Sequence, residues 1–189
     1  MTRKGHAVLE ALVENGCAEH IDRVIGAPDA HVQADYFEEI RSLCARSRIA
    51  FFDRETTDIP PSVWSLAVSW RWLLEVDNLI VLHDSLLPRY RGFAPLVSAL
   101  VNGDEEVGVT ALMATEEFDH GDIILQRAMR VEYPAKIGDV IRRISGLYAS
   151  MALEIATHLA AKRSLNVVPQ DHSRATYSLW RDEEDYVVD

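Results

Sequence analysis

The sequence is short of several features that mark common classes of protein. Only two of its 189 residues are cysteines, Cys17 and Cys44, and they have no metal-ligand spacing. We therefore expect reduced thiols rather than a disulfide framework or a structural metal site. No apolar run approaches the ~20 residues that a membrane-spanning helix needs. The first ten residues mix charged and apolar side chains, unlike a secretory leader. Together these features favour a cytoplasmic protein.

Basic residues are also scarce, since 19 Lys and Arg stand against 30 Asp and Glu, giving a formal net charge of −11. Broad phosphate-backbone binding needs clustered Lys and Arg, so we expect no nucleic-acid partner, and we expect no membrane partner either. A small anionic ligand needs only one local basic patch. The length and the 48% hydrophobic content are typical of a globular protein, and we predict a single domain over residues 1–189.

Hydrophobic patterning predicts strands that alternate with helices. Short apolar runs predict strands at 22–27, 49–52, 66–69, 79–82, 109–114 and 123–131. Apolar residues at helical spacing predict helices at 7–13, 36–47, 93–101 and 137 to about 162. The run LIVL at 79–82 is continuously apolar, as in strands that are covered on both faces. This order predicts an α/β fold with a mostly parallel sheet and helices on both faces.

Candidate chemistry lies in two polar clusters. His83 directly follows the 79–82 strand and begins the loop HDSLLPRYRG, and ligands of open α/β sheets bind beyond the carboxyl ends of strands. The second cluster, DHGD at 119–122, lies between two expected strands, where a carboxylate can orient an imidazole and accept a proton. Taken alone, each cluster fits a structural role better than a catalytic one, as a solvated turn or an acidic β-turn.

The loop HDSLLPRYRG resembles the signature of the formyltransferases that use 10-formyltetrahydrofolate. Gly108-Val109-Thr110 and Asp119-x-Gly121 follow in the order and spacing of that family, and residues 175–186 look like the end of the catalytic domain in sugar N-formyltransferases. The resemblance implies a Rossmann-like formyltransferase fold. It also implies transfer of a formyl group from 10-formyltetrahydrofolate to an amine of a nucleotide-linked amino sugar, in a chain that can form a homodimer.

The resemblance also implies roles for particular residues. His83 and Asp119 are the expected catalytic pair, with His83 stabilising a developing negative oxygen and Asp119 assisting proton transfer. The expected folate contacts are Ser69, Trp70, Arg71, Trp72, Leu73, Ser85, Leu86, Leu87 and Asp119. The expected contacts with the substrate are Arg89, Tyr90, Arg91 and Gly92.

The sequence departs from the family at one position that matters for catalysis. Family members place Asn two residues before the catalytic His, where this sequence has Val81. Loss of one oxyanion donor costs about 2.7–4 kcal/mol in other enzymes. A catalytically silent folate- or nucleotide-binding relative is therefore an open hypothesis.

A different acceptor and a different chemistry are also open. The family includes methionyl-tRNA formyltransferases, which act on another class of amine. A metal-dependent hydrolase could use His83, Asp84, Asp119, His120 and Asp122, which are residue types that bind metals. The sequence also starts with residues that resemble the loop after the first strand of the family, which predicts a fold that lacks that strand.

Overall fold

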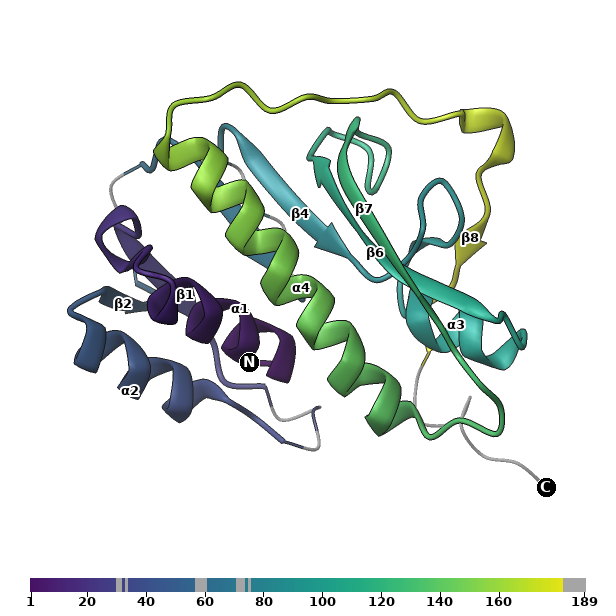
Figure 1. Cartoon of the computed structure of the whole chain (residues 1–189), viewed down its shortest axis with the longest axis horizontal. Coiled ribbons are helices and arrows are strands. Elements are labelled where there is room, and N and C mark those ends of the chain that lie inside the picture. Colours follow the sequence, from purple (N-terminus) through teal and green to yellow (C-terminus); the bar gives the residue numbers. More distant parts are fainter. Residues whose placement is uncertain (30–31, 33, 57–60, 71–73, 75, 182–189) are drawn as a thin grey trace.

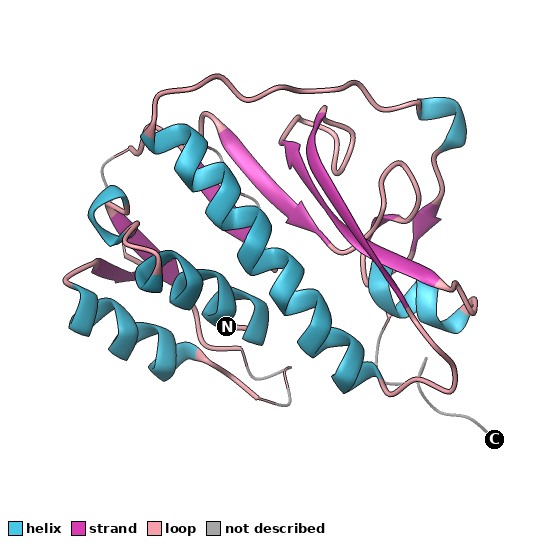
Figure 2. Ribbon diagram, in the orientation of Figure 1, coloured by secondary structure: helices cyan, strands magenta, loops and turns pink. Residues whose placement is uncertain are grey.

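The computed structural model describes residues 1–29, 32, 34–56, 61–70, 74 and 76–181 of the chain. Helices and strands are both present, so the predicted α/β class is confirmed (Figures 1 and 2). The helices are α1 (Arg3–Glu14), α2 (Phe37–Ser47), α3 (Pro95–Val101) and α4 (Ile137–Ala160), with short 3₁₀ turns at Ala18–His20 and His172–Arg174. The strands are β1 (Arg23–Gly26), β2 (Ala50–Asp53), β3 (Ser65–Val68), β4 (Leu79–His83), β5 (Arg91–Gly92), β6 (Glu106–Met113), β7 (Ile123–Arg130) and β8 (Tyr177–Ser178).

The main sheet has the order β3-β4-β6-β7. Strands β3 and β4 are parallel, as the sequence predicts, whereas β6 runs antiparallel to both β4 and β7. The link between β6 and β7 is short, which suits an antiparallel hairpin and not a parallel crossover. Two further parallel pairs form separate sheets, β1 with β2 and β5 with β8. Within the described residues no strand precedes α1, and the absence of the family's first strand stays a prediction.

One face of the main sheet packs against a pair of helices. Helices α1 and α4 lie side by side, and α4 crosses in front of the main sheet (Figure 1). Ile80 and Leu82 of β4 and Ile144 and Met151 of α4 belong to the same buried cluster, each at most 3% exposed. Side chains alternate along a strand, so Val81 and His83 lie on the opposite face from Ile80 and Leu82. This alternation places His83 away from the apolar core.

Helix α2 forms a second buried cluster with α1 and the residues around β2. Cys44 of α2 is fully buried there, and burial raises the pKa of its thiol to about 11. Both cysteines are buried and free in the structure. Among the described helices, none combines the length and apolar character that crossing a bilayer requires.

Candidate active site

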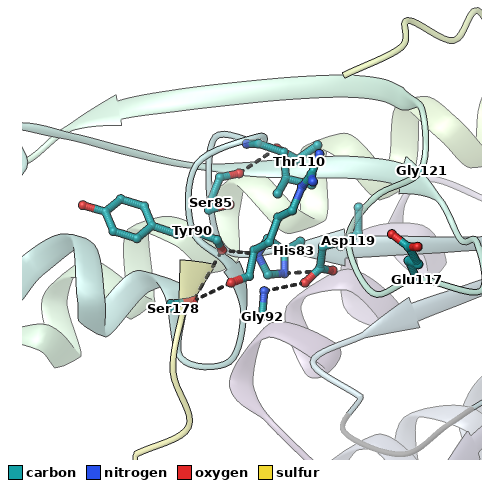
Figure 3. Close-up of polar contacts among 12 residues, drawn as sticks. His83, Ser85, Tyr90, Gly92, Thr110, Glu117, Asp119, Gly121 and Ser178 are labelled. Atoms are coloured by element: carbon teal, nitrogen blue, oxygen red, sulfur yellow. Dashed lines mark hydrogen bonds and ion pairs between the residues drawn. The ribbon is translucent and has the colours of Figure 1, made fainter. Parts of the chain in front are cut away.

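His83 is the last residue of β4 and its side chain is 8% exposed. Its Nε2 atom lies 2.8 Å from the carbonyl oxygen of Tyr90, and its Nδ1 atom lies 3.4 Å from Oδ1 of Asp119 (Figure 3). A carbonyl oxygen only accepts hydrogen bonds, so Nε2 carries a proton. The other ring nitrogen, Nδ1, faces the Asp119 carboxylate. The structure therefore brings together the two residues predicted to be catalytic.

Each carboxylate oxygen of Asp119 faces a polar group of the site. Its Oδ2 atom accepts a hydrogen bond of 2.8 Å from the backbone N–H of Gly92, while Oδ1 faces His83. The backbone of Asp119 has φ +59°, in the left-handed region that non-glycine residues rarely adopt. A conformation of this kind persists where neighbouring contacts enforce it.

Two glycines let the loops of the site approach each other closely. A Cβ atom at Gly92 would lie 2.6 Å from the carbonyl oxygen of Ser178, and φ at Gly92 is +97°. A Cβ atom at Gly121 would lie 1.7 Å from the carbonyl oxygen of Met113. Only glycine fits either position without a backbone shift. The glycines of the two sequence motifs thus bring their loops against neighbouring backbone.

A buried threonine and a glutamine fix the loop that follows His83. The Thr110 hydroxyl donates to the Ser85 carbonyl at 2.6 Å and accepts from the Leu87 N–H at 3.1 Å. The side-chain amide of Gln126 donates to the Leu87 carbonyl at 2.7 Å and to Thr110 at 2.9 Å. The Ser85 hydroxyl is buried and has no hydrogen-bond partner in the described part of the chain. A polar group of a bound ligand could therefore satisfy it.

Behind His83, a buried tyrosine supports the end of β4. The hydroxyl of Tyr148, on α4, donates to the Leu82 carbonyl at 3.0 Å. Burial, and then the nearby Asp84 carboxylate, raise the pKa of Tyr148 well above its ordinary value, so the phenol stays a donor. Lys4 of α1 forms an ion pair with Asp84. These contacts tie α1 and α4 to the strand end that carries His83.

Arg89 and Tyr90 both direct the polar ends of their side chains to Asp104. Arg89 pairs with Asp104 at 2.6 Å and is 48% exposed, while the Tyr90 hydroxyl donates to the same carboxylate at 3.0 Å. Tyr90 contributes its carbonyl to the site, and Gly92 contributes its N–H. It stays a prediction that Arg89, Tyr90 and Gly92 contact the substrate.

Arg91 is 1% exposed, and its side-chain partners in the described residues are one glutamine and two histidines. The guanidinium donates to Oε1 of Gln170 from Nε at 3.2 Å and from Nη2 at 2.7 Å. It also contacts Nε2 of His120 at 3.1 Å and Nδ1 of His172 at 2.9 Å. Its burial and occupied donors show a role in holding the protein together, and its contact with the substrate stays a prediction.

The remaining predicted folate contacts fall into two groups. Ser69 and Trp70 follow β3, which is parallel to β4, so they leave the sheet at the same edge as His83. Arg71, Trp72 and Leu73 lie outside the described residues. Sequence reasoning missed Gln126 and Gln170, because a glutamine outside any motif carries no local signal of its partners.

The metal-hydrolase hypothesis finds little support in the geometry. Among the residues that the structure describes, no group of three or more His, Cys, Asp or Glu side chains is placed to hold a metal ion. His120 points its Nδ1 atom at Glu117, 2.7 Å away, and its Nε2 atom at Arg91. A cationic guanidinium opposite an imidazole nitrogen opposes metal binding there.

Fold and site together define a formyltransferase-like α/β protein. Residues 68–154 match the formyl transferase family model. A methionyl-tRNA formyltransferase of Roseiflexus castenholzii is 37% identical over 142 residues, which is 71% of this chain and 45% of that protein. The chain thus spans less than half the length of this curated relative. Over these matched residues the chain is similar to the folate-dependent formyltransferases.

Solved structures share the fold at lower sequence identity. WlaRD, a sugar 3N-formyltransferase crystallised with dTDP and 5-N-formyl-THF, superposes with a TM-score of 0.75 at 16% identity, covering 93% of this chain and 65% of that one. The N-formyltransferase of Helicobacter canadensis, in complex with folinic acid and dTDP-3-aminofucose, gives 0.74 at 15% identity, covering 97% and 68%. At these identities the likeness establishes the fold alone.

Proposed function

We propose that this chain transfers a formyl group from 10-formyltetrahydrofolate to an amine of a nucleotide-linked amino sugar. The observation that carries the proposal is the His83–Asp119 pair, which lies at the carboxyl edge of β4 within the family's loop signature. A buried imidazole facing a carboxylate at 3.4 Å is an arrangement suited to acid–base chemistry on a small substrate.

Each residue of the pair has a distinct task in this proposal. The imidazole of His83 donates an N–H toward the formyl oxygen, where negative charge develops as the amine nitrogen bonds to the formyl carbon. To do so, Nε2 exchanges the Tyr90 carbonyl for that oxygen. Asp119 keeps the imidazole oriented through Nδ1 and stays close enough to accept the proton that the amine loses. When bound, the folate would supply the formyl group, and its own C–N bond to that group would break as the new amide bond is completed. The released tetrahydrofolate nitrogen would take up the proton that the amine loses.

The loop after His83 suits the folate donor in one testable respect. The Ser85 hydroxyl is buried without a partner among the described residues, directly beside His83. A buried hydroxyl that finds no protein partner costs free energy, and a polar group of a bound ligand would recover it. Ser69 and Trp70, at the neighbouring strand end, would contact the same ligand.

The acceptor is proposed from fold likeness and from charge. Two of the similar solved structures carry sugar-nucleotide or nucleotide ligands. The net charge of −11 opposes the long phosphate contacts of a tRNA. Methionyl-tRNA is the second candidate acceptor, because the curated relative at 37% identity carries that activity.

An acceptor panel separates the candidates. Purified chain would be incubated with 10-formyltetrahydrofolate and, in separate reactions, with nucleotide-linked amino sugars and with methionyl-tRNA. Mass spectrometry would detect a product heavier by one formyl group. Formylated sugar nucleotide alone would support the proposal, and formylated methionyl-tRNA alone would replace it with the second candidate. Folate binding without any formylated product would identify a silent relative.

A further inference from the structure

One buried side chain joins the catalytic loop to a distant part of the chain. Gln170 is 5% exposed, and its amide donates from Nε2 to the carbonyl oxygens of Asp119 at 2.8 Å and Gly121 at 2.7 Å. Its Oε1 atom accepts two hydrogen bonds from Arg91. A glutamine amide has two donor hydrogens and two acceptor positions. All of them are used here, so Gln170 bridges the loop at 119–121 and β5.

Arg91 gives this bridge a fixed anchor. Beyond its side-chain contacts, the Arg91 backbone N–H donates to the Thr176 carbonyl at 2.8 Å, and the Arg91 carbonyl accepts from the Ser178 hydroxyl at 3.1 Å. The side chain is 1% exposed and cannot reorient into solvent. A buried group with its donors satisfied on several sides is costly to displace. Gln170 is therefore held on one side, and it holds the loop on the other.

The loop at 119–121 needs such a restraint. Asp119 has φ +59°, which is unfavourable for a residue with a side chain, and left free it would relax toward an ordinary conformation. Relaxation would carry the carboxylate away from His83 Nδ1, which lies only 3.4 Å away. The two hydrogen bonds from Gln170 hold the Asp119 and Gly121 carbonyls in place and oppose this movement.

We propose that Gln170 is a positioning residue that fixes Asp119 against His83, with Arg91 as its anchor. The inference rests on the proposed function for its kinetic consequence, because Gln170 acts only through Asp119. It also predicts a property of the loop itself, which can be measured in the absence of turnover.

The substitution Gln170→Glu keeps the contact with Arg91 and removes the contacts with the loop at 119–121. The carboxylate keeps the acceptor positions that face Arg91, and the added charge favours that contact. It removes both N–H donors and places an anionic oxygen opposite the carbonyls of Asp119 and Gly121. Glu154→Gln is the matched control. It exchanges a carboxylate for an amide at a residue of α4 that pairs with Arg127 and lies outside the bridge.

Amide hydrogen exchange tests the inference directly. In the full chain, Gln170→Glu is expected to speed exchange of amides 117–121 at least tenfold, while α4 amides exchange as in the parent. Glu154→Gln should leave amides 117–121 unchanged. Unaltered exchange at 117–121 in a folded Gln170→Glu chain would overturn the inference, whatever the chain catalyses.

A double-mutant cycle tests the route through Asp119. Gln170→Glu is expected to lower kcat at least tenfold and Asp119→Asn to lower it further. The kcat of the double variant should then lie within threefold of the kcat of Asp119→Asn, because a residue that acts through Asp119 has nothing left to position. Effects that multiply would show an independent structural role and overturn the proposal. A parent chain without turnover would refute the proposed function, and hydrogen exchange alone would then decide the inference.

Discussion

Replacing Val81 with asparagine tests the most consequential departure of this chain from the formyltransferases it resembles. Val81 pairs with Ala67 of β3 and Leu112 of β6, and alternation along β4 puts its side chain on the face that carries His83. An amide there adds a donor beside the imidazole. One oxyanion donor is worth about 2.7–4 kcal/mol, or ~10²–10³-fold in kcat. We expect Val81→Asn to raise kcat by a factor that approaches ~10².

The same substitution carries a stability cost that can be measured separately. Val81 is partly buried between apolar neighbours, and an amide without a partner there costs roughly 1–3 kcal/mol. For a chain of this length that lowers Tm by roughly 2–4 °C per kcal/mol. Single-turnover kinetics at 20 °C, with Val81→Leu as the apolar control, would isolate the catalytic effect. Equal kcat in Val81→Asn and the parent, with folate bound equally, would refute the reasoning that a donor is missing at this position.

Three further outcomes are expected. Asp119→Asn should lower kcat by ~10²–10⁴-fold in steady-state assays, because the carboxylate that orients the imidazole is lost; a change below threefold would contradict this role. Gly92→Ala should destabilise the chain in denaturant titrations by more than Gly103→Ala, since both glycines have positive φ but only a Cβ at Gly92 meets the Ser178 carbonyl. Cys44 has a folded pKa of about 11, above its ordinary 9.0, so its stabilising contribution is complete below pH 9 and is lost as pH rises toward 11. Relative to Cys44→Ala, the parent should lose up to roughly 3 kcal/mol of unfolding free energy over that range, and parallel pH profiles would contradict the assignment.

The sequence predicted most of the elements that position the site. The continuous apolar run at 79–82 became β4, and His83, expected directly after that strand, is its last residue. The helical spacing from Ile137 onward became α4, which ends at Ala160, close to the predicted end. These predictions succeed because apolar periodicity reports directly on which side chains are buried.

Non-local contacts escaped prediction. The two-residue strands β5 and β8 pair positions 91 and 177, and no local pattern signals so short a pairing. Arg91 looked like a contact for an anion, yet its partners Gln170, His120 and His172 come from segments far along the chain. Burial of a charged side chain depends on such partners, and a local stretch of sequence does not reveal them.

The most direct test of the account compares the parent chain with His83→Ala for both folate binding and turnover. Binding of 10-formyltetrahydrofolate would be followed by calorimetry, and formyl transfer to nucleotide-linked amino sugars by mass spectrometry. The account predicts that the parent forms product and that His83→Ala loses it by at least ~10²-fold while still binding the folate. Undiminished product formation by His83→Ala would contradict the central claim that the His83–Asp119 pair performs the chemistry.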